Sequence, residues 1–416
     1  MSDENTAIVL GAGVVGLSTA LYLRRGGRDV TVIDPLPPGG GASYGNAGMI
    51  SADTASPIAM PGMLRQVPGW LRDKRGPLVV HPTYLPTALP WLMRWIKEGR
   101  IERVLAISDA LRALHKDAFS CWQDLIGPQV FGELVRRTGQ IQVWDGEGES
   151  VGARVERQIR ERHGIEAQVL GADDLQQMVP GISRAVRRAL LVPGNGYTIS
   201  PARLVGALAD RLRGEGGTIV AERALKLIPR EGGGFTVWTN VANRVGADVV
   251  VAGGAWSKTL LDPLAVRVPL ETERGYHAML PTPSIEPRYT ISYKSRGFGV
   301  TPMEGGLRAA GTVEFAGLDT PPDETRARIL AEHARALFPG LTHGEPQLWL
   351  GFRPSLPDTL PVLGPVPQQP GLHLAFGHGH YGMTAGPPSG RLVAALLARR
   401  AAPIDPAPYA VGRFAS

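Results

Sequence analysis

The feature that most constrains this chain is a strand, glycine turn, helix and strand spelled out in its first residues. From Thr6 to Asp34 it reads T-A-I-V-L-G-A-G-V-V-G-L-S-T-A-L-Y-L-R-R-G-G-R-D-V-T-V-I-D. We expect strands over Ala7–Leu10 and Asp29–Ile33, with an amphipathic helix between them. Three glycines alone mean little in a chain with 53 of them. Their full context predicts a βαβ unit that binds a dinucleotide.

The residues of the glycine turn have separate roles in such a unit. Gly11 makes the tight turn, Gly13 lets the backbone approach a pyrophosphate, and Gly16 allows close packing of helix on strand. The helix N-terminus offers free N–H groups to the phosphates. Asp34 ends the second strand about twenty residues further on, where a carboxylate can bind a ribose hydroxyl.

Composition narrows the class of protein. The chain has 416 residues, 43% of them hydrophobic and 20% charged, as expected for a globular enzyme of two or three domains. The formal charge of +6 comes from scattered basic residues that are not interleaved with aromatic ones, so we expect no nucleic-acid partner. A mild positive field instead favours a small anionic substrate or an acidic lipid surface.

The sequence shows no sign of a secreted or membrane-spanning protein. The single cysteine, Cys121, excludes an internal disulfide. Met1–Thr6 leads into the first strand without a signal-peptide pattern, and no run of about eighteen apolar residues occurs. We expect a cytoplasmic protein, and peripheral attachment to the inner face of the cell membrane stays open.

The later elements predict an α/β (α+β) fold. It would combine a Rossmann-like nucleotide domain, which the chain leaves and re-enters, with a substrate domain built on an antiparallel or mixed sheet with helices. We place the nucleotide domain at residues 1–57, 196–261 and 350–416, and the substrate domain at 58–195 and 262–349. The main expected helices are 101–126, 154–162, 172–178, 201–214, 323–338 and 392–400. The expected strands include 140–144, 218–221, 224–228, 235–239, 248–251, 289–292, 307–312 and 372–377.

Three separated stretches carry a resemblance to a known family. They are the amino-terminal unit with S-Y-G-N-A-G-M-I-S, then V-V-V-A-G-G-A-W-S, and finally G-F-R-P-S-L-P-D-T-L-P-V-L-G-P with F-G-H-G-H-Y-G-M-T. Together they resemble the FAD-dependent D-amino acid oxidase/glycine oxidase superfamily, and within it the bacterial D-amino acid dehydrogenases most. The likeness covers nearly the whole chain in order.

The resemblance implies a non-covalently bound FAD, because the C-terminal cysteine of the covalent branches is absent. Val14 and Val15 would contact the pyrophosphate. Ser43 would make a phosphate contact that Ala42 cannot share. A side chain at Gly48 would clash with the isoalloxazine, and a helix starting within Gly379–Thr384 would point at the flavin O2 side. The implied cofactor-binding residues are Gly11, Gly13, Val14, Val15, Gly16, Asp34, Pro35, Ala42, Ser43, Asn46, Ala47, Gly48, Met49, Leu225, Gly253, Trp256, His378, Gly379, Tyr381, Gly382, Met383 and Thr384.

Arg353 matches the family arginine that binds the substrate carboxylate, and a guanidinium fork grips a carboxylate in a way that lysine cannot copy. His380, Tyr276 and His277 are further catalytic candidates, for which a packing role is equally open. His378 and His380 have the spacing of metal ligands, but no third ligand lies nearby, so we expect no metal.

The implied activity is FAD-dependent dehydrogenation of a small D-amino acid by hydride transfer from Cα to flavin N5, giving a 2-oxo acid or cyclic imine. His380 and Tyr381 stand where broad dehydrogenases have threonine and leucine, which indicates a narrower substrate such as a D-proline-like or D-hydroxyproline-like ring. Two alternatives stay open. One is a glycine/sarcosine-type oxidase that releases peroxide, and the other is a non-catalytic flavin subunit that passes electrons within a complex.

The electron acceptor depends on residues 58–100, where Trp70, Trp91, Leu92, Trp95 and Ile96 lie among arginines and lysines. This segment either rests on a membrane and delivers electrons to quinone, or covers the substrate cavity. Oxygen is a further candidate acceptor.

Overall fold

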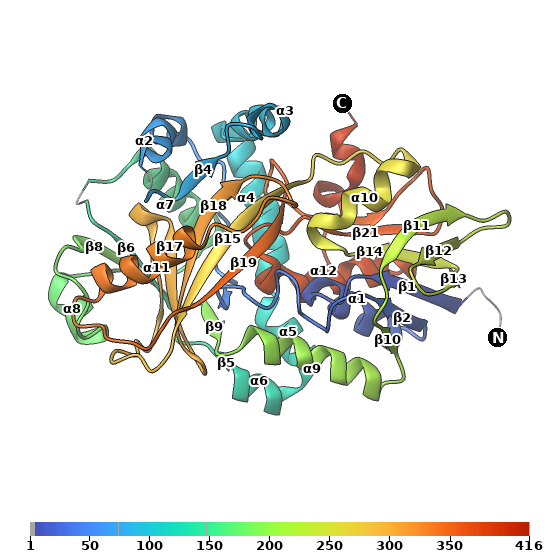
Figure 1. Cartoon of the computed structure of the whole chain (residues 1–416), viewed down its shortest axis with the longest axis horizontal. Helices are drawn as coiled ribbons and strands as arrows, with labels where there is room; N and C mark the ends of the chain where they lie inside the picture. The colour runs from blue at the N-terminus through green and yellow to red at the C-terminus, as the bar shows by residue number, and fades with distance from the viewer. Residues whose placement is uncertain (1–4, 74, 147, 416) are drawn as a thin grey trace.

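The computed structural model describes residues 5–73, 75–146 and 148–415, and it contains two large sheets that lie side by side (Figure 1). The first sheet has six strands in the order β10-β2-β1-β14-β21-β20. All neighbours are parallel except β20 and β21. Its strands are β1 (Thr6–Leu10), β2 (Asp29–Ile33), β10 (Thr218–Val220), β14 (Asp248–Val251), β20 (Val362–Pro365) and β21 (Leu372–Phe376).

The apolar strand β1 is buried on both faces because each face of the sheet is covered. Ala7 and Val9 pack toward the helices α1 (Val14–Arg25), α9 (Pro201–Gly214) and α12 (Gly382–Leu397). Ile8 and Leu10 alternate with them and pack toward a small antiparallel sheet on the other side. That sheet consists of β11 (Ala224–Pro229), β12 (Phe235–Thr239) and β13 (Asn243–Gly246).

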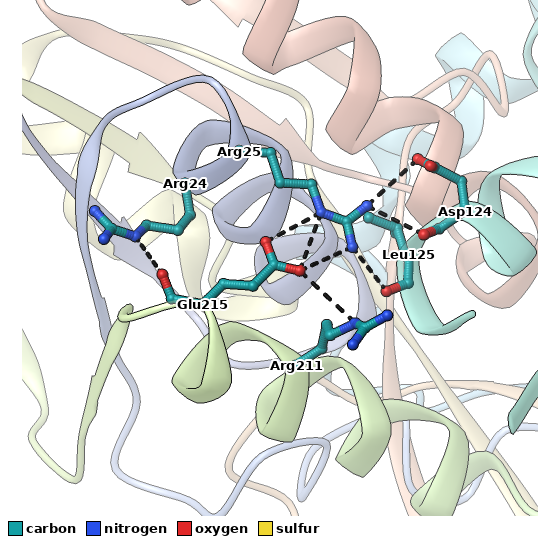
Figure 2. A network of polar contacts seen from close by, with 6 residues as sticks. All are labelled: Arg24, Arg25, Asp124, Leu125, Arg211 and Glu215. Carbon is teal, nitrogen blue, oxygen red and sulfur yellow. Dashed lines mark hydrogen bonds and ion pairs between the residues drawn. The ribbon is translucent and has the colours of Figure 1, made fainter.

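Polar contacts fix the end of α1 to its neighbours. Arg25 donates to both carboxylate oxygens of Glu215, at 3.0–3.2 Å, and to the carbonyls of Asp124 and Leu125. Figure 2 shows how Arg25 and Arg211 converge on Glu215 from two helices. The network holds α1, α5 (Ala118–Ile126) and the C-terminus of α9 together beneath the first sheet.

The segment predicted as one helix over 101–126 is two helices, α4 (Ile101–His115) and α5 (Ala118–Ile126), followed by α6 (Pro128–Leu134). Their apolar residues belong to the core shared by α1, α9 and α12, as Leu111, Trp122 and Phe131 show. The predicted boundaries assign this segment to the substrate domain, whereas its packing joins it to the nucleotide-binding half.

The helix predicted from Leu392 begins ten residues earlier, at Gly382, as the family resemblance implies. Pro387 and Pro388 lie inside it and obscure the helical pattern. Pro387 cannot donate to the carbonyl of Met383, and the indole N–H of Trp122 donates to that carbonyl instead, at 2.9 Å. A Cβ at Gly390 would lie 2.7 Å from the backbone of Ser18, so glycine permits the close contact of α12 with α1.

The second sheet has nine strands, with β19, β15, β18, β17, β16, β6, β8 and β7 in order and β4 paired to β18. Their bounds are β4 (Leu78–Val80), β6 (Gln140–Trp144), β7 (Gln168–Leu170), β8 (Arg188–Val192), β15 (Glu271–Leu280), β16 (Thr290–Tyr293), β17 (Phe298–Met303), β18 (Gly306–Phe315) and β19 (Gln347–Ser355). Because β19 lies wholly in this sheet, residues 350–355 belong here and not to the nucleotide-binding half as the predicted boundary at 350 has it.

Helices cover the second sheet and the edge between the two halves. The helix α11 (Glu324–Leu337) shares a core with β15 and β18. A short sheet of β3 (Met49–Ile50), β9 (Gly196–Thr198) and β5 (Val135–Arg136) continues the loop that follows β2. The remaining helices are α2 (Val67–Arg72), α3 (Leu85–Glu98), α7 (Val151–His163), α8 (Ala172–Met178) and α10 (Ser257–Leu261).

Candidate active site

A long cavity of about 1290 Å³ joins the two halves. One end lies over the carboxyl ends of β1 and β2, and the other lies against β15, β18 and β19 of the second sheet. Crevices at the carboxyl ends of parallel strands are where open α/β sheets bind their ligands.

The glycine turn builds one end of this cavity. Gly11 has φ +118°, and an added Cβ would overlap the Ala252 carbonyl. A Cβ at Gly16 would overlap the carbonyl of Gly11. Only glycine therefore allows β1 to enter α1 this closely, and the first N–H groups of α1 face the cavity.

Asp34 and Ser43 close over that helix N-terminus. The carboxylate of Asp34 accepts hydrogen bonds from the backbone N–H of Ala12, at 2.7 Å, and of Leu36, at 2.8 Å. Burial raises the pKa of Asp34, although these two N–H groups oppose the rise. The Ser43 hydroxyl accepts from the Val14 N–H at 3.1 Å. The site thus presents a carboxylate and a hydroxyl beside the N-terminus of α1, a set of groups that suits a ribose and a pyrophosphate.

The loop after β2 and the start of α12 form the middle of the cavity. The Thr384 hydroxyl accepts from the Ser51 N–H at 2.9 Å, and the Tyr381 hydroxyl donates to the Ser56 carbonyl at 2.9 Å. His378 is buried and hydrogen-bonds Ser389 at 2.9 Å. Burial lowers the pKa of His378 to about 3, so its ring is neutral at ordinary pH.

Gly48 is needed for the packing of the protein itself. It has φ +77°, and its Cβ would lie 2.6 Å from Met303 Cε and 2.9 Å from the Thr198 carbonyl. The clash is therefore with the protein itself. Gly48 does not line the cavity, whereas its neighbours Ala47 and Met49 do.

Arg353 lies at the other end of the cavity, on the edge strand β19. Its guanidinium donates to the carbonyls of Thr312, at 2.8 Å, and Gly311, at 3.3 Å. A Cβ at Gly275 on the neighbouring strand would overlap the guanidinium of Arg353. Glycine at this position therefore leaves the space that the guanidinium occupies. Burial lowers the pKa of Arg353, which Glu273 opposes. Two of its five N–H donors are used by these carbonyls, and others remain for a ligand.

His380 and Glu273 complete this end. Glu273 stands directly opposite Arg353 in the pairing of β15 with β19, and His380 Nε2 lies 2.6 Å from its Oε2. Glu273 is only 4% exposed. Burial alone would raise the pKa of Glu273, but His380 and Arg353 outweigh it and hold the pKa below its ordinary value. The carboxyl is therefore ionised inside the cavity.

The structure does not bring the other two catalytic candidates to the same point. The Tyr276 hydroxyl donates to Glu314 at 2.7 Å and accepts from the Asp323 N–H, so it is directed into the second sheet's polar core although the residue borders the cavity. His277 is absent from the cavity lining; it donates to the Gly45 carbonyl at 3.0 Å and stacks on Trp349. Burial lowers the pKa of His277 to about 3.

Most residues of the predicted cofactor set do line the cavity. Gly16 and Gly48 are the exceptions, and both act through packing. Those that line it are Gly11, Gly13, Val14, Val15, Asp34, Pro35, Ala42, Ser43, Asn46, Ala47, Met49, Leu225, Gly253, Trp256, His378, Gly379, Tyr381, Gly382, Met383 and Thr384.

Sequence reasoning missed Glu273, Gly275 and Trp349, which line the substrate end. They lie on long strands whose pairing register is not visible in the sequence. The signal that could have found two of them is E-T-E-R-G-Y-H, where charged residues and a glycine lie within a strand that is buried from its second residue on.

Residues 58–73 and 75–100 cover the substrate end of the cavity. Trp70, Trp91, Leu92 and Trp95 line it, and the Trp91 indole donates to the Ser355 carbonyl at 3.3 Å. The outer surface of the same segment nevertheless exposes several apolar side chains, namely Leu64, Leu71, Leu85, Leu89, Met93 and Ile96. Figure 1 shows α2 and α3 together at the top edge of the molecule.

Residues 5–73, 75–146 and 148–415 contain neither a bilayer-crossing helix nor a metal-binding cluster. No helix there combines the length and apolarity needed to cross a bilayer. In the same ranges, no three His, Cys, Asp or Glu side chains gather where they could hold a metal ion.

The fold and the cavity define a flavin-dependent oxidoreductase. Residues 6–396 match the DAO family, described as FAD dependent oxidoreductase, and the chain belongs to that family. It is 38% identical over 427 residues to a D-amino-acid oxidase of Bradyrhizobium diazoefficiens, with 100% of each chain covered. It is 28% identical to a D-amino acid dehydrogenase of Vibrio cholerae, with 96% of each covered.

Solved structures agree on the fold. A glycine oxidase from Geobacillus kaustophilus superposes with a TM-score of 0.74 at 22% identity, covering 99% of this chain and 98% of that one. An L-proline dehydrogenase from P. horikoshii gives a TM-score of 0.76 at 17% identity, covering 100% and 99%. The predictions of family, fold class and FAD are confirmed.

The residues present fit FAD. The glycines of the turn leave space that a Cβ would fill, and the cavity continues from there to Arg353. Cys121 is buried in α5 and is absent from the cavity lining, so it offers no thiol for covalent attachment.

Proposed function

We propose that this enzyme oxidises the Cα–N bond of a small D-amino acid, with a proline-like ring as the preferred substrate. The observation that carries the proposal is the Arg353 guanidinium, held in the cavity by the carbonyls of Gly311 and Thr312 with N–H donors to spare. The names of the relatives support an amino acid as the substrate. Such an anchoring group has no role in a subunit that only passes electrons.

The chain's own groups would bind and orient the substrate. Arg353 holds the carboxylate through two parallel charged hydrogen bonds. Trp91, Trp95 and Trp349 surround that position and exclude water. His380 and Tyr381 replace smaller or purely apolar residues and narrow the space for a side chain. When bound, the flavin supplies the acceptor for the Cα hydride at N5, and the start of α12 directs its dipole toward the cavity.

The test is anaerobic mixing of the holoenzyme with a panel of D- and L-amino acids, including D-proline and glycine, while the flavin's visible absorption is followed. We expect bleaching by D-amino acids and fastest bleaching by cyclic ones. Arg353→Lys should slow bleaching about 100-fold at low substrate, because the loss of a bidentate pair costs about 3 kcal/mol. Arg162→Lys, which alters a surface ion pair with Asp109, is the control. Absence of bleaching by every amino acid would contradict the proposal.

Oxygen is the rival acceptor to quinone, and one observation favours it. The relative named D-amino-acid oxidase is more similar, at 38% identity, than the dehydrogenases at 28–32%. Turnover under air with stoichiometric peroxide would assign an oxidase. Turnover that requires an added quinone analogue would assign a dehydrogenase.

For the quinone alternative, we propose that α2 and α3 rest on an anionic membrane surface. The exposed leucines of these helices are accompanied by the exposed cations Arg65, Arg72, Arg94 and Lys97. This combination is typical of interfacial helices. The enzyme should float with vesicles that contain an anionic lipid. The double variant Leu89→Asp/Met93→Asp should stay in the dense fraction. Equal flotation of the wild type and the double variant would contradict the proposal that α2 and α3 face the membrane.

A further inference from the structure

Resting on the proposed function, we propose that His380, held by Glu273, accepts the proton that the substrate's ammonium group loses before its Cα–N bond is oxidised. An amino acid carries this proton near neutral pH, whereas formation of the C=N bond uses the nitrogen lone pair. A proton acceptor beside the carboxylate anchor would meet this need.

The first support is placement. Glu273 and Arg353 are direct partners in the pairing of β15 with β19, so their side chains project from the same face of the sheet. His380 reaches the same carboxylate from the loop before α12, at 2.6 Å. All three line the cavity. A substrate whose carboxylate binds Arg353 therefore has its amine close to the pair.

The second support is the tautomer of His380. An ionised carboxylate can only accept hydrogen bonds, so His380 Nε2 carries the hydrogen that binds Glu273. In the neutral ring, Nδ1 then carries the lone pair. No hydrogen bond among the described residues engages Nδ1, and the side chain is 32% exposed. The imidazole is thus presented as a base, and it can pass a proton on to solvent.

The third support is charge. Arg353 and Glu273 neutralise each other, and a zwitterionic amino acid adds no net charge. In the transfer, an N–H bond of the ammonium breaks, its electron pair stays on the substrate nitrogen, and an N–H bond forms at Nδ1. The resulting imidazolium lies against Glu273, so no uncompensated charge is buried.

Among the groups that surround His380, Glu273 is the charged group in direct contact with it. The helix α3 contributes Trp91 and Trp95, and the loop after β19 contributes Thr359, none of which carries a charge. Beyond Glu273, Glu271 binds the Tyr84 hydroxyl at 2.9 Å, and burial raises the pKa of Glu271. His378 is neutral. Arg353 also carries a charge, and it stands opposite Glu273.

The experiment is anaerobic flavin reduction by the best D-amino acid, followed by stopped flow from about pH 6 to 10, across the range in which a histidine and then an amine lose their protons. Near neutral pH, His380→Gln should be slower by about 100-fold, the usual scale of base catalysis. Its rate should then rise about tenfold per pH unit as the free amine becomes available, until it approaches the wild type. Glu273→Gln should lose less of the reduction rate than His380→Gln does. The fall of its rate toward acid pH should also occur at a different pH from that of the wild type.

The controls separate this role from a structural one. His343→Gln, on a loop of the second sheet, should match the wild type. Propionate, which has a carboxylate and no amine, should perturb the flavin spectrum equally in wild type and His380→Gln. A loss in His380→Gln that is the same at every pH, or no loss at all, would overturn this inference alone. A wild-type flavin that no amino acid reduces would overturn the proposed function as well.

Discussion

The two ends of the cavity are built by opposite means. At the nucleotide end, backbone N–H groups and missing side chains form the site, and Gly11, Gly13, Asp34 and Ser43 lie within 33 residues of one another. At the substrate end, charged side chains form it, and Glu273, Arg353 and His380 come from three separate segments. Backbone sites tolerate no added atoms, whereas side-chain sites depend on the register of distant strands.

The largest effect should come from breaking the backbone end. Gly11→Val places a branched side chain at φ +118° against the Ala252 carbonyl, so the turn must move. We expect purified protein without FAD and without activity, measured by flavin absorption after reconstitution. Gly41→Ala is the matched control, because it also lines the cavity but has open space around it. Full flavin content in Gly11→Val would remove the contrast between the two ends.

A smaller effect should come from a glycine at the substrate end. Gly275→Ala displaces the Arg353 guanidinium without approaching the nucleotide end. We expect kcat/KM to fall about 100-fold through weaker carboxylate binding, the scale of a lost charged pair, with flavin content unchanged. Steady-state kinetics and the flavin spectrum check both parts. Gly206→Ala in α9, which meets open space, should change neither.

Acid should distinguish the buried histidines from the carboxylate at the substrate end. Burial lowers the pKa values of His115 and His373 to about 4 and of His277 and His378 to about 3. Between about pH 6.5 and 4, the unfolded chain therefore binds more protons, and the free energy of unfolding falls as pH falls. Each histidine contributes up to about 1.4 kcal/mol per pH unit. Urea unfolding should show this slope, and His378→Asn should reduce it.

The Glu273 carboxyl should behave differently in the same experiment. Its lowered pKa stabilises the fold above the ordinary value of about 4.5, and this contribution is lost only on further acidification. Glu273→Gln should therefore leave the slope above pH 5 unchanged. A reduced slope there would show that the substrate end shares the acid sensitivity of the buried histidines.

The smallest effect should come from the surface network of Figure 2. Glu215 and Arg25 are partly exposed, so Glu215→Ala should cost about 1 kcal/mol of unfolding free energy and leave kcat/KM unchanged. Asp210→Ala, which loses a highly exposed pair with Arg213, should cost less than can be measured. A loss of activity in Glu215→Ala would show that the frame beneath α1 influences the cavity.

The sequence by itself determined the nucleotide end, because its determinants are local. Glycine spacing, strand alternation and a terminal aspartate fix β1, α1 and β2 within one short segment, and the predicted strand Asp29–Ile33 has the bounds observed. The family resemblance then predicted FAD as the cofactor and Arg353 as the carboxylate-binding residue. The prolines and glycines that flank Arg353 make that motif distinctive. Propensity misplaced the start of α12, since it could not show that Trp122 satisfies the carbonyl that Pro387 leaves free.

Only the tertiary structure decided how the substrate end is assembled. The pairing of β15 with β19 sets Glu273 opposite Arg353, and the packing of α12 on α1 brings His380 to both. It also turned Tyr276 into the sheet's polar core and folded the tryptophans of residues 58–100 over the cavity. Register and packing arise from contacts between residues tens to hundreds of positions apart, and local sequence patterns do not record them.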